Sequence, residues 1–217
     1  MNKAFISKKF GTLNFILCIF IVCMHSDCSF SSTSTSVIKF FGLLNTFFDI
    51  SVPLFFFLSA FWFYYKFDYI EDEFPIKIKK RINSLVIPYL SFSALYLIWN
   101  TVISKTFLFE YSTYSFLEMP IKTTAKIWIL AKCDPAIWFV RPLIILQFIS
   151  LPFYIFIKKN FLYGAFGAII ILLLNIILKS EYKNAVYWLP IFILGIWFAV
   201  HKDFFYSKIS LIKHNKL

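Results

Sequence analysis

Long apolar segments separated by shorter charged or polar ones set the pattern of this chain. Six of them have the character of membrane helices: residues 10–27, 50–65, 82–104, 136–157, 160–178 and 185–200. A helix needs about 20 apolar residues to cross a bilayer, and interfacial Trp, Tyr and Lys can complete a shorter one. The pattern predicts an all-α fold: a polytopic membrane helix bundle with about six transmembrane helices in a single domain, residues 1–217.

The segments between these helices are predicted to be loops or hinges. Residues 26–46 are rich in Ser and Thr and are typical of a loop, which could contain an amphipathic piece over residues 37–44. Residues 66–81 indicate a charged hinge that starts acidic, breaks at Pro75 and then turns basic. Residues 105–135 indicate a long, mildly amphipathic loop, a kind of segment that often carries function. Pro88 predicts a kink in the third helix unless that helix begins there.

The basic N-terminus followed by the first apolar segment is also compatible with a signal peptide. The residues after Met24 offer no small-residue cleavage site, so a retained first helix is the preferred interpretation. In this interpretation His25 ends the first membrane helix.

The four cysteines do not form a disulfide framework. Cys18 and Cys23 lie within the first apolar segment and are expected to pack there. Cys28 and Cys133 would both lie outside the membrane, so the sequence leaves open whether they pair.

Composition supports the membrane interpretation and narrows the choice of partners. Hydrophobic residues make up 60% of the chain, aromatic residues 22%, and the mean hydropathy is +0.75, which exceeds the needs of a soluble domain. The formal net charge is +11, but the basic residues are dispersed between apolar segments, which argues against nucleic acid. The expected partner is the lipid bilayer. The sequence has no Cys/His cluster with metal-ligand spacing and no Gly-rich phosphate loop, so neither a bound metal nor a bound cofactor is expected.

The distribution of basic residues predicts the orientation of the six helices. With a cytoplasmic N-terminus, 14 of the 22 Lys and Arg residues fall in the inner segments and 8 fall on the other side. The inner ones are Lys3, Lys8, Lys9, Lys66, Lys77, Lys79, Lys80, Arg81, Lys158, Lys159, Lys202, Lys208, Lys213 and Lys216. This excess predicts that both termini are cytoplasmic, which places His25 at the external end of the first helix.

The first helix carries two polar side chains on one face. Asn14 and His25 are eleven residues apart, almost three turns, so they share a face about 16 Å apart along the axis. A titratable imidazole at the end of a membrane helix suggests function by default; the alternative is a helix-end histidine in the headgroup region. Imidazole can act near neutrality as the base that takes a proton from a hydroxyl.

Five pieces of the chain, taken in order, resemble one family. They are the helix ending in His25, SVPLFFFLSAFWF (51–63), KKRINSLVIPYL (79–90), WFVRPLIIL (138–146) and LPIFILGIWF (189–198). Together they resemble the membrane-bound acyltransferase 3 family of bacterial surface-glycan O-acyltransferases. The resemblance covers most of the chain.

The resemblance implies a transferase of groups other than amino-acyl. It would move an acyl group, usually acetyl, from acyl-CoA to a hydroxyl of a cell-surface or lipid-linked glycan. Acyl-CoA would be a donor substrate from the cytosol, with no bound cofactor. His25 matches the residue proposed as catalytic in the family, and the implied location is the inner cell membrane, with several passes.

Three features depart from the family's pattern. Asn14 stands where the family usually has an arginine, and Ala60 where it usually has a glycine. The family normally continues with several more helices, so this chain resembles the N-terminal portion of the fold and its active site could be incomplete. The rival interpretation is a catalytically inactive, truncated membrane protein, or a small glycan or solute export subunit.

Several other polar residues are candidates for substrate binding, each with a structural alternative. Asn14 could donate a hydrogen bond to the amide-bearing arm of the donor, or it could be a packing residue. Asp27 could orient His25 or bind acceptor hydroxyls, or it could be a solvated loop carboxylate.

Two further candidates are basic. The run that contains Lys77, Lys79, Lys80 and Arg81 could hold the phosphates of the donor, or it could anchor the inner side of the bundle. Arg141 is the one charge in the fourth apolar segment. It could pair with an acid, bind a carboxylate or phosphate, or snorkel to the outer interface. The sequence leaves open the acceptor sugar, the acyl chain, the oligomeric state and the choice between direct transfer and an acyl-enzyme.

Overall fold

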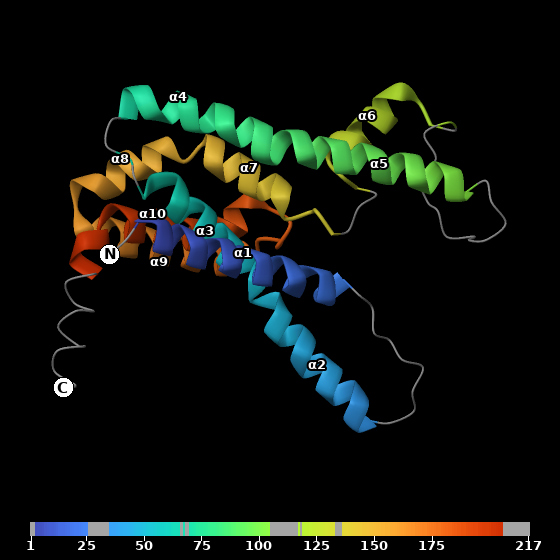
Figure 1. Ribbon diagram of the computed structural model, residues 1–217, viewed down its shortest axis with the longest axis horizontal. Coiled ribbons are helices and arrows are strands. Elements are labelled where there is room, and N and C mark those ends of the chain that lie inside the picture. The colour runs from blue at the N-terminus through green and yellow to red at the C-terminus, as the bar shows by residue number, and fades with distance from the viewer. Residues whose placement is uncertain are drawn as a thin grey trace.

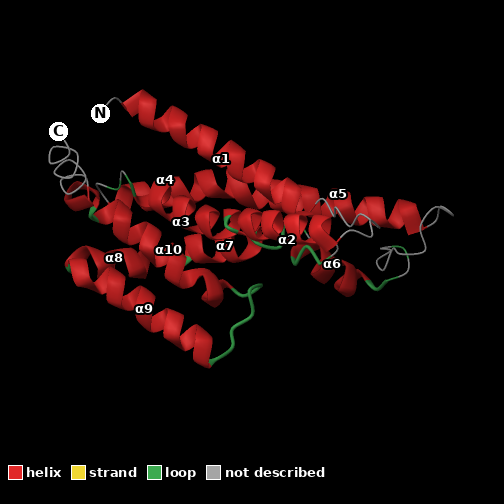
Figure 2. Ribbon diagram, turned by 90° about the horizontal axis from the view of Figure 1, so that it is seen from below, coloured by secondary structure: helices red, strands yellow, loops and turns green. Residues whose placement is uncertain are grey.

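The computed structural model of the protein describes residues 3–25, 35–65, 67, 70–104, 117, 119–132 and 136–205. Every regular element within these residues is helical, which confirms the all-α prediction for them (Figure 2). The elements are α1 (Lys3–His25), α2 (Thr35–Asp49), α3 (Ser51–Tyr64), α4 (Ile70–Arg81), the π-helical turn η1 (Ile82–Val86), α5 (Ile87–Ser104), α6 (Ile121–Ile129), α7 (Val140–Phe148), α8 (Leu151–Lys159), α9 (Phe161–Ile177) and α10 (Ala185–Val200).

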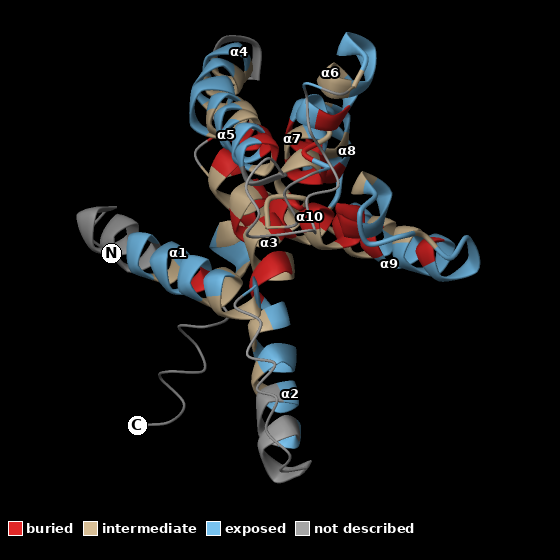
Figure 3. Ribbon diagram, turned by 90° about the vertical axis from the view of Figure 1, so that its right-hand side faces the viewer, coloured by how far each residue is buried: buried red, intermediate tan, exposed pale blue. Residues whose placement is uncertain are grey.

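Helices α3 and α10 pack against each other at the centre of the bundle. Both are apolar on all sides, the character of a helix that is buried all round. Buried residues concentrate where these two helices meet, while α1, α2 and α9 extend outward with exposed faces (Figure 3). Gly195 permits the close approach, because a Cβ at this position would lie 2.4 Å from the carbonyl oxygen of Phe57 and 2.8 Å from the Cβ of Ala60.

Helix α9 packs on α10 through its small residues and turns large apolar side chains outward. Gly164 and Ala168 are buried, and a Cβ on Gly164 would lie 2.4 Å from the ring of Trp197. Ile169, Ile170 and other large apolar side chains of α9 are more than half exposed. A stable helix with this surface needs lipid around it, because water would not cover so much apolar area. The protein is a membrane protein.

The described helices supply candidates for each predicted crossing, although they differ in length. Gly42–Tyr64 and Glu73–Val102 are long and apolar enough to span a bilayer, and the bent pair α7 and α8 makes a third candidate if it counts as one span. The apolar helices Gly11–His25, Phe161–Ile177 and Ala185–Val200 are shorter. The total of six crossings and the side on which the termini lie stay predictions.

Two segments predicted to be loops or hinges are helical. Residues 35–46 belong to α2, which contains the amphipathic piece expected over residues 37–44 and is longer than it, and they extend the second apolar segment backward from Ser51. The charged hinge is α4, which runs through Pro75 without ending there. Pro75 is the sixth residue of α4, beyond the first turn in which proline costs nothing, and the helix nevertheless continues to Arg81. Part of the segment 105–135 is also helical, as the amphipathic helix α6.

Pro88 was expected to kink the third helix or to begin it; the structure has a π-helical turn just before the proline, within a helix that continues through it. The backbone N–H of Ile87 donates to the carbonyl of Ile82, five residues back, immediately before the proline. Pro88 has no N–H to donate to the carbonyl of Ser84, four residues earlier. The wider π-helical turn makes room for the proline ring. The continuous helix Glu73–Val102 has 30 residues, about 45 Å at 1.5 Å per residue, so it projects beyond a hydrocarbon core of about 30 Å.

The fourth apolar segment is broken, contrary to the prediction of one helix over 136–157. Helices α7 and α8 meet at an angle of 59°. Pro152 lies in the first turn of α8, where its missing N–H costs nothing, and it cannot continue the hydrogen bonds of α7. The Oγ of Ser150 donates to the carbonyl of Gln147 at the break, 2.6 Å away.

Candidate functional site

Helix α1 lies against the bundle along one narrow stripe. Leu17 is buried, and Ile21 and Met24 pack against the core beside it. Asn14 and His25 lie on the neighbouring face of the helix, as their spacing predicts, and both are exposed. No hydrogen bond joins the His25 ring to another described residue. Asp27 lies outside the described residues, as do Cys28 and Cys133.

The C-terminal end of α3 is surrounded by cations from distant parts of the chain. Lys77 Nζ donates to the carbonyl of Phe63 over 2.9 Å, and it also pairs with Glu73 at 3.3 Å. Lys202 Nζ donates to the carbonyl of Tyr65 over 2.8 Å. These lysines satisfy carbonyls that the helix end leaves without partners and oppose its negative dipole. Both lysines therefore stabilise the end of α3, and a ligand would have to compete with these contacts to bind them.

The remaining candidates of the basic run differ in their exposure to solvent and in their contacts with the rest of the protein. Lys79 and Lys80 are exposed. The guanidinium of Arg81 is half-buried and lies 5.8 Å from the centre of the Phe63 ring, within the range of a cation–π contact. Lys79 and Lys80 are thus the residues of this run best placed to meet phosphates from solution.

The structure separates the basic run from His25. Phe20 of α1 contacts Phe47 and Phe48, so the last part of α1 lies near the start of α3. The basic run lies near the other end of α3. Helix α3 has 14 residues and is about 21 Å long. Figure 1 shows α1 running away from the N-terminus, with α4 beginning on the same side as that terminus.

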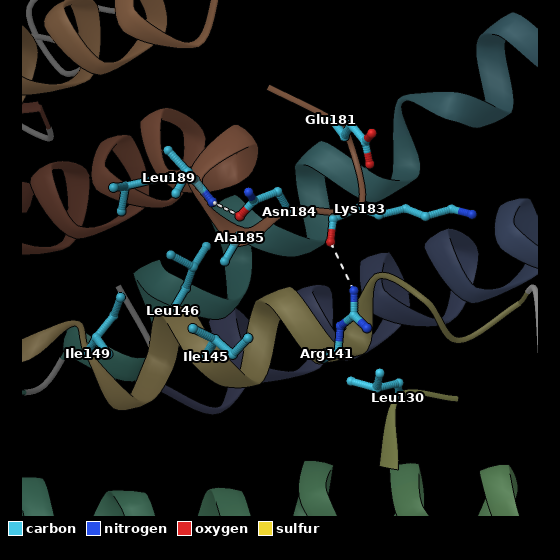
Figure 4. Close-up of a pocket in the computed structure, with 11 residues that line it drawn as sticks. Leu130, Arg141, Ile145, Leu146, Ile149, Glu181, Lys183, Asn184, Ala185 and Leu189 are labelled. Atoms are coloured by element: carbon cyan, nitrogen blue, oxygen red, sulfur yellow. Dashed lines mark hydrogen bonds between the residues drawn. The ribbon is translucent and has the colours of Figure 1, made fainter. Parts of the chain in front are cut away.

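Arg141 lies in an open cleft at the beginning of α7. Its Nη2 donates to the carbonyl of Lys183 over 3.3 Å, across to the turn between α9 and α10 (Figure 4). The cleft has a volume of about 610 Å³. Its lining comprises Leu130, Arg141, Ile145, Leu146, Ile149, Glu181, Lys183, Asn184, Ala185, Val186 and Leu189. Of the residues predicted to bind substrate, Arg141 is the one that lines this cleft.

The two turns that border the cleft are fixed by the same backbone motif. After α9, Lys179 has φ 48°, its N–H donates to Ile176, and the N–H of Ser180 donates to Asn175. After α6, Ala131 has φ 45° and makes the equivalent bonds. This left-handed ending satisfies the last carbonyls of each helix. It holds Leu130 and the 181–184 segment at the rim.

A buried polar cluster joins α3 to the α7–α8 bend, and the sequence reasoning missed it. The Nε2 of Gln147 donates to the Oγ of Ser59, and the hydroxyls of Tyr64 and Ser150 share a hydrogen bond. Gln147 is fully buried, and its Oε1 accepts no hydrogen bond. A lone amide within an apolar membrane segment was a usable signal, of the same kind that drew attention to Arg141.

A second buried amide explains how α10 tolerates a proline. The Nδ2 of Asn175 donates to the carbonyl of Val186 over 2.9 Å, and Val186 lies four residues before Pro190. Pro190 has no N–H for that carbonyl, so Asn175 of α9 supplies the donor. Within the described residues, no group of three or more His, Cys, Asp or Glu side chains could hold a metal ion.

Comparison with protein families gives a match to a family model described as an acyltransferase domain, over residues 12–214. The matched range includes Asn14, His25, the basic run of α4 and Arg141. The comparisons with curated proteins and with solved structures find no match.

Proposed function

This chain belongs to the acyltransferase 3 family, and on that premise we propose that it is a membrane O-acyltransferase acting on a glycan. The acyl group, acetyl in the expected case, would pass from acyl-CoA to a hydroxyl of a cell-surface or lipid-linked sugar. The protein would lie in the inner cell membrane with six crossings. The family match over nearly the whole chain, including the helix that ends in His25, is the observation that supports this proposal.

His25 is the proposed general base. Transfer of an acyl group to a hydroxyl requires removal of the hydroxyl proton as the new ester bond forms, and the thiol of the donor leaves. An imidazole is chemically suited to that proton transfer. The exposed His25 ring has no described hydrogen-bond partner to occupy it. Asn14 on the same face is proposed to bind the amide-bearing arm of the donor.

Lys79 and Lys80, with Arg81 beside them, are proposed to bind the phosphates of acyl-CoA. Exposed ammonium groups suit this role because the phosphates arrive from solution. Since the basic run and His25 lie at opposite ends of α3, the arm of the donor would have to extend about the length of that helix, roughly 21 Å. Asp27 is proposed to orient His25 or to bind acceptor hydroxyls.

The test of His25 is acyl transfer in membranes that carry the full chain. His25→Ala should lower transfer of labelled acetyl from acetyl-CoA to surface glycan by about 10²- to 10⁴-fold. Val22→Ala is the matched control, because Val22 is exposed on the same helix one turn earlier, and it should keep full activity at equal protein abundance. Undiminished transfer by His25→Ala would remove this residue from the mechanism.

The test of the donor site separates phosphate binding from general charge. Lys79→Gln with Lys80→Gln should raise the KM for acetyl-CoA about three- to tenfold, the effect of two partly screened charges. Lys122→Gln with Lys126→Gln, on the exposed side of α6, removes the same charge and should not. With acetyl-pantetheine, which has no phosphate, all these variants should have the same KM. A difference that persists with that donor would contradict the assignment.

A further inference from the structure

The cleft at Arg141 has an apolar floor and a polar rim. Ile145, Ile149 and Leu189 give the cleft apolar side chains at one end, and the charged residues Arg141, Lys183 and Glu181 lie toward the other (Figure 4). Ile145 is 44% exposed and Ile149 48% exposed. Such a cleft is wetted poorly by water and suits a ligand with an apolar portion.

The rim of the cleft is electropositive. The guanidinium of Arg141 has five N–H donors, and one bond, to the carbonyl of Lys183, is described for it. No carboxylate of the described residues lies within 4.0 Å of this guanidinium; Glu181, the acidic residue in the lining, forms no ion pair with it. Arg141 therefore offers further N–H donors to a ligand in the cleft.

Two helix ends add to this positive potential. Helices α7 and α10 both begin at the cleft, at Val140 and Ala185. The first turn of a helix carries a partial positive charge of about half a unit. Arg141 in the first turn of α7 thus has the same sign as the helix dipole, an unfavourable placement that a bound anion would relieve.

We propose that this cleft binds an anionic lipid. The phosphate or carboxylate of the head would accept hydrogen bonds from Arg141, and an alkyl chain would lie along Ile145, Ile149 and Leu189. A lipid fits better than a free anion, because its alkyl chain can pack on the apolar side chains of the cleft while its head group pairs with Arg141. The proposal goes beyond the acyl-transfer reaction and does not depend on His25.

The head-group contact is tested by lipid binding to the purified full chain in neutral detergent, measured by native mass spectrometry. Dioleoyl phosphatidylglycerol should bind at least about tenfold more tightly than dioleoyl phosphatidylcholine, as expected for charge-assisted hydrogen bonds. Arg141→Gln should abolish that preference, and Arg141→Lys should keep part of it. Lys122→Gln removes the same charge outside the cleft and should bind as the unaltered chain does. Equal preferences in Arg141→Gln and Lys122→Gln would overturn the proposal.

The contact with the chain is tested separately. Ile145→Asn should weaken phosphatidylglycerol binding several-fold, whereas Ile155→Asn, at a site of similar exposure on α8, should not. Inorganic phosphate at millimolar concentration should fail to displace the lipid; displacement would assign the site to a free anion instead. His25→Ala should bind the lipid normally even where acyl transfer is lost, so failure of the catalytic proposal leaves this one standing. Loss of lipid binding in His25→Ala would place the lipid elsewhere.

Discussion

The contact between α3 and α10 can be probed by adding one methyl group. In Gly195→Ala the new Cβ would lie 2.4 Å from the backbone oxygen of Phe57, whereas real Cβ atoms stay beyond about 3.0 Å. The two helices must therefore separate by at least 0.6 Å, because a backbone carbonyl in the middle of α3 cannot turn away. A gap of about 0.5–1 Å forfeits a quarter to a half of the dispersion energy of each contact across the interface.

The magnitude follows from this geometry. Overpacking of a close-packed interface costs about 1–3 kcal/mol. Exchange of Gly for Ala also gains up to about 1 kcal/mol of helix propensity, which would mask part of that cost. Gly167→Ala is the matched control, since it makes the same exchange in α9 with no atom within 4 Å of the new Cβ. Relative to this control, Gly195→Ala should be destabilised by about 1–3 kcal/mol.

Equilibrium unfolding in mixed detergent micelles, followed by circular dichroism, measures the difference between the two variants. Because propensity cancels, the comparison reports the helix contact alone. Equal free energies of unfolding for Gly195→Ala and Gly167→Ala would refute the close approach of α3 and α10.

Three further changes test other contacts by the same unfolding measurement. Lys202→Gln should lower the free energy of unfolding by about 1 kcal/mol, because the carbonyl of Tyr65 loses a partly screened charged donor; Lys159→Gln, at an exposed lysine, should change it little. Asn175→Ala should cost about 1–3 kcal/mol, since the carbonyl of Val186 would be left without a donor, and an unchanged value would mean that the Pro190 site is satisfied otherwise. Lys179→Gly should raise stability by about 1 kcal/mol, because glycine adopts the positive φ at no cost; a loss of stability would contradict the described turn.

Hydrophobic pattern was sufficient to place most of the helices but not their ends. The apolar segments at 160–178 and 185–200 correspond closely to α9 and α10, because a long uncharged run in a bilayer has no alternative to helix. Within residues 26–46 the prediction allowed one amphipathic piece, over residues 37–44, whereas the helix already begins at Thr35 and continues past that piece; Ser and Thr, typical of loops in water, do not prevent a helix beside a membrane. Pro75 was predicted to be the break in a charged hinge, but a proline weakens a helix without necessarily ending it, and α4 continues past this one to Arg81.

The geometry of the candidate sites depended on contacts that the sequence does not display. Arg141 was identifiable as an isolated charge, but six of the eleven residues that line its cleft lie between positions 181 and 189, on another helix and a turn. Lys77 was grouped with its neighbours as a phosphate ligand, whereas the fold engages it at the end of α3. Pro152 could have predicted the bend at Ser150. The prediction of a single helix followed instead from the uninterrupted apolar character of the segment. The roles of His25 and Asn14 stay predictions that activity measurements must decide.

The lysine that closes the end of α3 has a consequence for how the protein is made. Lys202 follows the last described membrane helix, 137 positions after the carbonyl it contacts. The ribosome releases α3 into the bilayer long before it synthesises Lys202. During that time the carbonyl of Tyr65 must accept a hydrogen bond from water or from another donor. The final turn of α3 therefore reaches its native contacts late in synthesis. In a nascent chain halted before position 202, this region should react with water-soluble labelling reagents that cannot reach it in the finished protein.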